Sequence, residues 1–130
     1  MSFCFVFKNT IINNMKKLII KFKCLDGNYN LFVENNTYSI ETSIFGFENK
    51  EGIIDDYDSF LSNINKANIY SWTKENESTN IIDAVEWYVQ IDDYSINGYE
   101  GSWPYNYDLL IEALEKLDYN ISLFKANSNK

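Results

Sequence analysis

The chain lacks histidine and arginine altogether, although it is 130 residues long. Without histidine, Ser-His-Asp and Cys-His catalytic arrangements and histidine-ligated zinc sites are impossible. Without arginine, all 11 basic residues are lysines, and 19 acidic residues give a net charge of −8. Binding to nucleic-acid phosphates needs a cationic face and usually arginine forks, and anionic membranes attract the same kind of surface. We therefore expect neither a nucleic-acid partner nor a membrane partner.

Cysteine is scarce, and long apolar runs are missing. Cys4 and Cys24 are too few for a disulfide framework and lack the spacing of a metal site, so they fit a reducing cytoplasm. No run approaches the ~18 apolar residues needed to span a bilayer. The apolar N-terminus has no basic leader and no cleavage-like site, so it is a weak signal-peptide candidate. No G-x-G-x-x-G or Walker-type loop is present, and we expect no cofactor.

What the chain does contain is typical of one folded domain. Its hydrophobic content of 45% and aromatic content of 17% are too high for disorder. Abundant asparagine, isoleucine and lysine without arginine suggest an AT-rich bacterial or phage genome. Because Met15-Lys16-Lys17-Leu18 resembles an ordinary bacterial start, we interpret residues 1–14 as an upstream extension or a loosely attached arm.

Alternation of apolar and polar residues predicts several short strands. The predicted strands cover residues 18–24, 29–33, 38–44, 69–73, 85–91 and 94–97, with a further short run ending near Phe124. Turns are expected at Asp26-Gly27-Asn28, Asn35-Asn36 and Asp92-Asp93, and loops at 45–54 and 74–80. Two-residue turns join only antiparallel neighbours, so a regularly alternating parallel sheet is excluded.

Two amphipathic helices follow the hairpins, each with an Asx cap and an acidic first turn. Asp55 or Asp56 caps the first helix, and Asn106 caps the second. The apolar stripes are Tyr57, Phe60, Leu61 and Ile64 in the first helix, and Tyr107, Leu110, Ile111, Leu114 and Leu117 in the second. We predict a single α+β domain with an antiparallel or mixed sheet of about six or seven strands and both helices on one face.

The two halves of the chain resemble each other in sequence. The segments that align without gaps are FVENNTYSIE (32–41) with YVQIDDYSIN (88–97), and DYDSFLSNINK (56–66) with NYDLLIEALEK (106–116). One interpretation is a duplicated β-β-α-β unit, at residues 25–74 and 81–124. The other is that any two strand-turn-strand-helix units look alike in a biased composition.

Acidic residues gather at two places that could carry chemistry. Two carboxylates can serve a glycosidase-like mechanism, and the clusters are Asp55-Asp56-Asp58 and Asp92-Asp93. Acids are favoured at a helix start and in a hairpin turn for local reasons, however. A hard-cation site such as Ca²⁺ is disfavoured because the EF-hand spacing is absent. We therefore expect neither an enzyme nor a metal site.

Aromatic residues point to a candidate binding surface. If the helices cover the face that carries Leu31 and Trp87, the alternate residues form a wet, negatively charged face, unless the N-terminal arm or the 45–54 loop covers it. Tyrosine and tryptophan often anchor interfaces. Trp103 lies beside Pro104 before the second helix, where packing of this loop onto the helix is the alternative. The candidate binding residues are Phe32, Glu34, Glu86, Tyr88, Asp92, Asp93, Tyr99 and Trp103.

One pattern resembles a motif of small uncharacterised bacterial proteins. It consists of Trp87-x-Val89-x-Ile91, then Gly101-x-Trp103-Pro104-x-Asn106-Tyr107 and a helix. The likeness covers roughly residues 85–117 and carries no catalytic residues. Here tryptophan precedes the proline where tyrosine is expected, and Gly101 stands in place of an asparagine. More loosely, a small, acidic, histidine-free α+β protein is similar in type to toxin-immunity proteins and anti-defence inhibitors.

We therefore expect a non-enzymatic binding protein that neutralises a basic protein, such as a toxin nuclease or a nucleic-acid-binding effector. Its acids would compete with phosphates and speed association, and its exposed rings would anchor the contact. The alternative is a small-molecule or nucleotide-derivative binder, a sponge or weak hydrolase with an aromatic cleft near Trp103. A third hypothesis is a self-associating protein, such as a homodimer.

Overall fold

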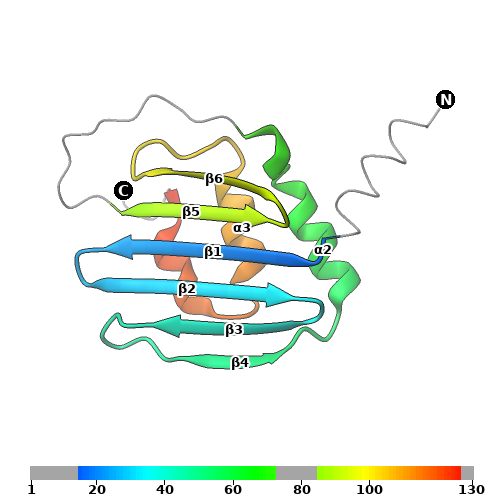
Figure 1. Cartoon of the computed structure of the whole chain (residues 1–130), viewed down its shortest axis with the longest axis horizontal. Coiled ribbons are helices and arrows are strands. Elements are labelled where there is room, and N and C mark those ends of the chain that lie inside the picture. The colour runs from blue at the N-terminus through cyan, green and yellow to red at the C-terminus, as the bar shows by residue number, and fades with distance from the viewer. Residues whose placement is uncertain (1–14, 73–84, 127–130) are drawn as a thin grey trace.

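In the computed structural model, which describes residues 15–72 and 85–126, the strands form one antiparallel sheet (Figure 1). The strands are β1 (Lys17–Cys24), β2 (Gly27–Glu34), β3 (Thr37–Thr42), β4 (Lys50–Ile53), β5 (Glu86–Ile91) and β6 (Tyr94–Tyr99). The helical elements are α2 (Tyr57–Lys66), η1 (Ile69–Ser71), α3 (Tyr107–Leu114) and η2 (Tyr119–Phe124). The strand order β4-β3-β2-β1-β5-β6 confirms the predicted α+β class. Predictions for residues 1–14 and 74–80 lie outside the described residues.

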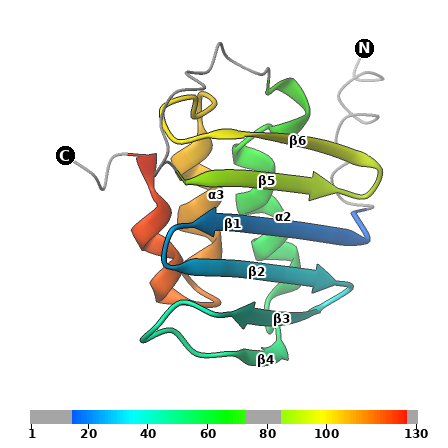
Figure 2. The same ribbon diagram turned by 60° about the vertical axis from the view of Figure 1, so that its left-hand side comes forward.

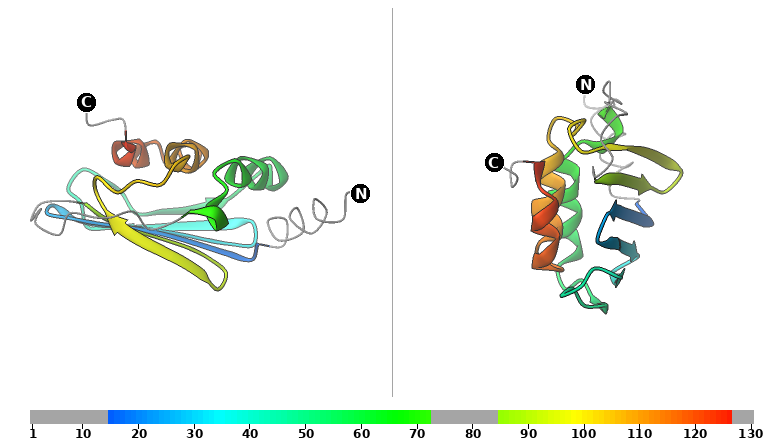
Figure 3. Two further views of the ribbon diagram at one scale, coloured as in Figure 1. Left: turned by 90° about the horizontal axis from the view of Figure 1, so that it is seen from above. Right: turned by 90° about the vertical axis from the view of Figure 1, so that its left-hand side faces the viewer.

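The described helices all lie on one side of the sheet (Figures 2 and 3). Successive side chains of a strand point to opposite faces, and in β1, β2 and β5 most of the helix-facing ones are buried. In β1, for example, Leu18, Ile20 and Phe22 are at most 1% exposed. Trp87 of β5 reaches the same core and contacts the ring of Tyr107 from α3. In the two described ranges, no helix has the length and apolar character required to cross a membrane.

Two-residue turns join β2 to β3 and β5 to β6, as predicted. The first turn residue has a positive φ in both cases, 57° at Asn35 and 50° at Asp92, a conformation that asparagine and aspartate adopt more readily than most residues. The Asp92 carboxylate also accepts hydrogen bonds from the backbone N–H groups of Lys16 and Lys17, at 2.9 and 3.0 Å. Asp92 therefore holds the β5–β6 hairpin against the start of β1.

The starts of the two α-helices differ in their caps. Asp56 caps α2 as predicted, because its carboxylate accepts a hydrogen bond from the Ser59 N–H at 3.1 Å. Asn106 precedes α3, but its φ of 71° is left-handed and its side chain makes no capping hydrogen bond. A side-chain cap needs a non-helical, usually extended backbone at that residue, so the prediction of an Asn106 side-chain cap is wrong. Its carbonyl instead accepts a hydrogen bond from Leu109 N–H at 3.1 Å.

One strand lies in the segment 45–54, for which the sequence predicts a loop. Residues Lys50–Ile53 form β4, which pairs with β3 at the edge of the sheet. Three of its four side chains are exposed, so backbone pairing and not apolar alternation forms this strand. The contact continues past the strand, because Ile54 N–H donates to the Asn36 carbonyl at 2.7 Å. An edge strand of this kind leaves no periodic signal in the sequence.

The runs predicted as short strands after each helix are 3-10 helices, η1 and η2. Their buried residues are three apart, Ile69 with Trp72 and Ile121 with Phe124. This spacing fits three residues per turn and not the two-residue period of a strand. Asn68, whose φ is 51°, separates α2 from η1. Its carbonyl accepts a hydrogen bond from the Ser71 N–H at 2.9 Å. The prediction of strands there is therefore wrong.

The two similar halves share their hairpin-then-helix order but not their hand. β2 and β5 both pair antiparallel with β1, so they run in the same direction. β3 lies outside β2 and β6 lies outside β5, whereas α2 and α3 lie on the same face of the sheet (Figure 3). Placing one hairpin on the other requires a half-turn about the strand direction, which would move its helix to the opposite face. Duplication therefore stays a prediction at the level of sequence.

Candidate functional site

The side of the sheet opposite the described helices, which we call the open face, is the candidate site (Figure 3). Directly opposite residues of paired strands share a face, so the strand register defines its members. They are Glu51 and Ile53 on β4; Thr37, Ser39 and Glu41 on β3; Asn28, Asn30, Phe32 and Glu34 on β2; Lys17, Ile19, Lys21 and Lys23 on β1; Glu86, Tyr88 and Gln90 on β5; and Ser95, Asn97 and Tyr99 on β6. None of them is buried.

Charge on the open face is divided along the line between β1 and β2. The acidic half, formed by β2, β3 and β4, carries Glu34, Glu41 and Glu51 and no lysine. The lysine half, formed by β1, β5 and β6, carries Lys17, Lys21, Lys23 and Glu86. The net charge of the open face is thus −1, against −8 for the chain. The prediction of a negatively charged face is therefore right for one half only, because the alternation of β1 places three lysines on the other.

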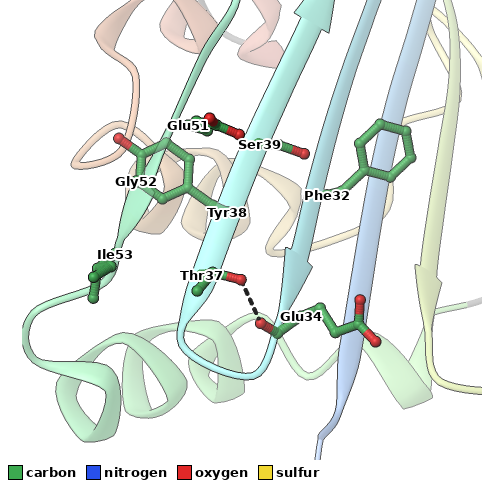
Figure 4. Close-up of a pocket in the computed structure, with 8 residues that line it drawn as sticks. All are labelled: Phe32, Glu34, Thr37, Tyr38, Ser39, Glu51, Gly52 and Ile53. Carbon is green, nitrogen blue, oxygen red and sulfur yellow. Dashed lines mark hydrogen bonds between the residues drawn. The ribbon is translucent and has the colours of Figure 1, made fainter.

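The acidic half contains an open hollow of about 430 Å³ (Figure 4). It is lined by Phe32, Glu34, Thr37, Tyr38, Ser39, Glu51, Gly52 and Ile53. Tyr38 follows the helix-facing alternation of β3, but its ring lies over Gly52, where a Cβ atom would come within 3.0 Å of Tyr38 Cε1. Thr37 Oγ1 donates to the Glu34 carbonyl at 2.9 Å, which fixes the β2–β3 turn beside the hollow. Rings and carboxylates thus share one concave surface.

The lysine of β4 does not neutralise this hollow, because it lies on the other side of the sheet. Lys50 is opposite Ile40 in the register, and its Nζ lies 3.8 Å from Asp118 Oδ1. Asp118 is 6% exposed and accepts a hydrogen bond at 2.8 Å from the hydroxyl of Tyr29, which is fully buried. Burial, followed by the Asp118 hydrogen bond, raises the pKa of Tyr29 far above its ordinary value. This cluster joins η2 to the sheet.

A second open hollow, of about 510 Å³, lies mainly on the lysine half and extends to β2. It is lined by Lys21, Phe22, Lys23, Asn28, Asn30, Glu86, Tyr88 and Asn97. Lys21 Nζ lies 5.8 Å from the centroid of the Tyr88 ring, within cation–π range. The Tyr88 hydroxyl donates to Gln90 Oε1 at 2.6 Å, and Gln90 Nε2 donates to the Asp92 carbonyl at 2.7 Å. These hydrogen bonds fix a half-exposed ring beside the Lys21 ammonium group.

The structure brings together some of the predicted binding residues and separates others. Those on the open face are Phe32, Glu34, Glu86, Tyr88 and Tyr99. Asp92 and Asp93 form the β5–β6 turn, where Asp92 is used in the hydrogen bonds to β1. Trp103 lies on the helix-covered side, with its ring centroid 4.4 Å from that of Tyr107 and 6.2 Å from that of Trp87. Trp103 is therefore not part of the open face, and its ring packs against α3, as the packing alternative predicts.

Other residues of the open face are missing from the sequence prediction. Ile19, Lys21 and Lys23 on β1 carry a usable signal, because they alternate with buried residues in the strand predicted over 18–24, whereas Lys17 lies one residue before that prediction. Glu51 and Ile53 carry none, because the sequence predicts a loop where β4 lies. These residues decide how charge is divided on the open face.

Orphan polar atoms and metal-binding groups are both absent from the described residues. Throughout residues 15–72 and 85–126, every buried side-chain nitrogen or oxygen has a hydrogen-bond partner, so no orphan polar atom there marks a ligand. The same ranges contain no group of three acidic or cysteine side chains placed to hold a metal ion. Cys24 is a free thiol that donates to the Gly27 carbonyl at 3.2 Å, and burial raises its pKa. The function has to be inferred from the open face itself, because no family model, curated protein or solved structure matches this chain.

Proposed function

We propose that this protein is a non-enzymatic binding protein that neutralises a basic protein, and that the acidic half of the open face is its docking surface. The hollow of Figure 4 supports this most directly. It combines rings, an exposed aliphatic side chain and two glutamates, and no helix of the described part of the chain covers it. Interfaces are commonly anchored by such concave aromatic surfaces, with charged groups at the rim.

A lysine or arginine side chain of the partner has the chemistry that this hollow would hold. The cation would pair with Glu34 or Glu51, which lie on opposite sides of the hollow, and the aliphatic stem would pack against Phe32 or Ile53. Contact of a cation with an aromatic face contributes about 0.5–1 kcal/mol at an exposed site. The ion pairs gain strength when the partner excludes water from the carboxylates, because the local dielectric constant falls. The hollow therefore favours a cationic side chain over an acidic or purely apolar one.

A partner that itself binds nucleic acid fits this chemistry best. Such a protein presents a row of cations to phosphates, and carboxylates can occupy the same cations. The chain's charge of −8 would also speed the encounter. We therefore propose an inhibitor of the immunity or anti-defence type, acting on a toxin nuclease or a nucleic-acid-binding effector. A cytoplasmic location is part of the proposal, since Cys24 is a free thiol.

Affinity capture with charge-matched variants tests the proposal. Glu34→Gln/Glu51→Gln removes the two carboxylates of the hollow, whereas Asp58→Asn/Glu112→Gln removes two exposed acids from the helices. Both variants have the same net charge. At low salt, the wild type and the helix variant should retain a basic protein from the native cell, and the hollow variant should lose it. Equal retention by both variants, or capture of no basic protein by the wild type, contradicts the proposal.

A second candidate function is favoured by the hollow of the lysine half. Its two ammonium groups, three asparagine side chains and the Tyr88 ring could hold a small anionic ligand with an aromatic part, such as a nucleotide derivative. The ligand would lie at this hollow and not near Trp103, whose ring packs against α3. Thermal denaturation with a panel of nucleotides tests this function. Stabilisation of the wild type that is lost in Lys21→Gln/Lys23→Gln would support it, and no stabilisation by any nucleotide would oppose it.

A further inference from the structure

The division of charge on the open face coincides with the middle of the sheet. The line between β1 and β2 leaves three strands on each side, β4-β3-β2 and β1-β5-β6. Glutamates lie on one side of this seam and lysines on the other, with Glu86 as the exception. Ile19 and Phe32 lie directly opposite each other across the seam, and both are half-buried. An apolar pair therefore marks the centre of a face whose two halves have opposite charge.

We propose that a second copy of this chain docks on the open face, related to the first by a two-fold axis that runs along the seam, parallel to β1 and β2. A symmetric interface must be complementary to itself. Rotation about this axis keeps the position along each strand and exchanges β1 with β2, β5 with β3 and β6 with β4. The lysine half of each copy then covers the acidic half of the other.

The strand register fixes which residues meet. Lys17 is level with Glu34, so each Lys17 faces Glu34 of the second copy and the four charges alternate around the axis. Ile19 is level with Phe32, so two isoleucines and two phenylalanines form an apolar cluster one row further along the strands. Tyr88 faces Glu41 of the second copy, since both are level with Asn30. The ion pairs, the apolar cluster and this polar contact all follow from one rotation.

The size of the face predicts a weak, concentration-dependent dimer. Strands about 4.8 Å apart and residues about 3.3 Å apart along them give a face of roughly 600 Å². Two such faces bury about 1,200 Å², at the lower limit for a specific interface. Twisted sheets that pack face to face cross at about −30°, so they diverge away from the axis. The side chains nearest the seam, Lys17, Ile19, Phe32 and Glu34, therefore contribute most.

The dimer and the proposed basic partner would use the acidic half in the same way. In the dimer, Lys17 of a second copy faces Glu34, one of the two glutamates with which the partner would otherwise pair. The partner would then displace the second copy, and the free protein would keep its acidic half covered. The dimer does not rest on the proposed function, because its mass is measured on the purified chain alone.

Charge reversal at the seam provides the test, read out by analytical ultracentrifugation over a wide range of concentrations. Lys17→Glu places four acids around the axis, and Glu34→Lys places four lysines there, so each variant should be monomeric where the wild type is dimeric. An equimolar mixture of the two variants should form a heterodimer, because the two seam acids of one chain then face the two seam lysines of the other. The double variant Lys17→Glu/Glu34→Lys should again form a homodimer.

Two controls separate the interface from folding. Circular dichroism should show that each variant is folded, since loss of a cross-strand pair alters stability by only about 0.2–1 kcal/mol. Lys116→Glu, on the exposed surface after α3, should leave the dimer unchanged. A wild type that is monomeric at every concentration overturns the proposal. A dimer that persists in Lys17→Glu, or variants that stay monomeric when mixed, overturns the seam as the axis.

Discussion

Gly98 on β6 is the position where one added methyl group should disturb the core most. A Cβ atom there would lie 2.7 Å from Trp87 Cζ2 and 2.8 Å from Ser102 Oγ. Carbon atoms in contact are normally ~3.5–4.0 Å apart, so the neighbours would have to move by about 1 Å. We therefore predict that Gly98→Ala destabilises the fold, although alanine suits a strand better than glycine.

Neither neighbour can move cheaply. Trp87 is 1% exposed, its Nε1 donates to the Tyr99 carbonyl at 3.3 Å, and its ring packs against Trp72 and Tyr107. Ser102 Oγ donates to the same carbonyl at 2.7 Å. Overpacking a well-filled core costs about 1–3 kcal/mol. Replacing glycine by alanine offsets about 0.4–1 kcal/mol of this cost, because it lowers the conformational entropy of the unfolded chain. The free energy of unfolding should fall by about 1–2 kcal/mol.

Urea denaturation of Gly98→Ala, Gly52→Ala and the wild type measures this effect. Gly52 is the matched control, because its added Cβ would meet the Tyr38 ring at 3.0 Å, where a half-exposed ring at the sheet edge can turn aside. A double-mutant cycle with Trp87→Phe adds a sharper test, since phenylalanine lacks the Cζ2 atom. Gly98→Ala should cost less in that background. Wild-type stability of Gly98→Ala, or a larger loss in Gly52→Ala, would refute the reasoning.

The remaining predictions concern two buried or bonded side chains. The pKa of Tyr29 in the folded protein is raised above its unfolded value of ~10. The stability linked to this group is therefore fully present below pH 10. Above pH 10, the free energy of unfolding falls by up to ~1.4 kcal/mol per pH unit. Urea denaturation on both sides of pH 10 should show a shallower loss in Tyr29→Phe, and an unchanged slope would contradict the linkage. Asp92→Ala removes two hydrogen bonds to β1 and should lower the free energy of unfolding by about 1–3 kcal/mol. Asp93→Ala, exposed in the same turn, should change it by less than ~0.5 kcal/mol.

The sequence predicts well the strands and helices in which buried residues recur at one regular spacing. β1, β2 and β5 alternate strictly between buried and more exposed residues, and each carries β-branched or aromatic side chains on the helix side. The predicted stripe of α2 is Tyr57, Phe60, Leu61 and Ile64, of which the last three are buried and Tyr57 is half-buried. In these segments, the local pattern and the tertiary packing require the same conformation, so the pattern is sufficient.

The parts that escape prediction depend on a partner elsewhere in the chain. β4 exists because β3 offers an unpaired edge, and its own side chains are mostly exposed. Trp103 is classed with the binding residues because the sequence does not show that its ring reaches Tyr107. The three lysines of β1 are visible from the alternation, but the seam is not, because it depends on the order in which the hairpins join the sheet. The open face could therefore be anticipated, and its charge pattern could not.

The charge distribution also predicts that different residues control the association and the dissociation of a basic partner. The open face contributes a net charge of only −1 to a chain of −8, so most of the long-range attraction comes from acids on other surfaces. Those acids raise the association rate constant, whereas desolvated groups at the contact set the dissociation rate constant. For a captured partner, Asp58→Asn/Glu112→Gln should therefore slow association at low salt and leave dissociation unchanged. Glu34→Gln/Glu51→Gln should accelerate dissociation at every salt concentration. Surface plasmon resonance distinguishes the two, and identical effects of both variants on both rate constants would mean that charge alone, without the hollow, holds the partner.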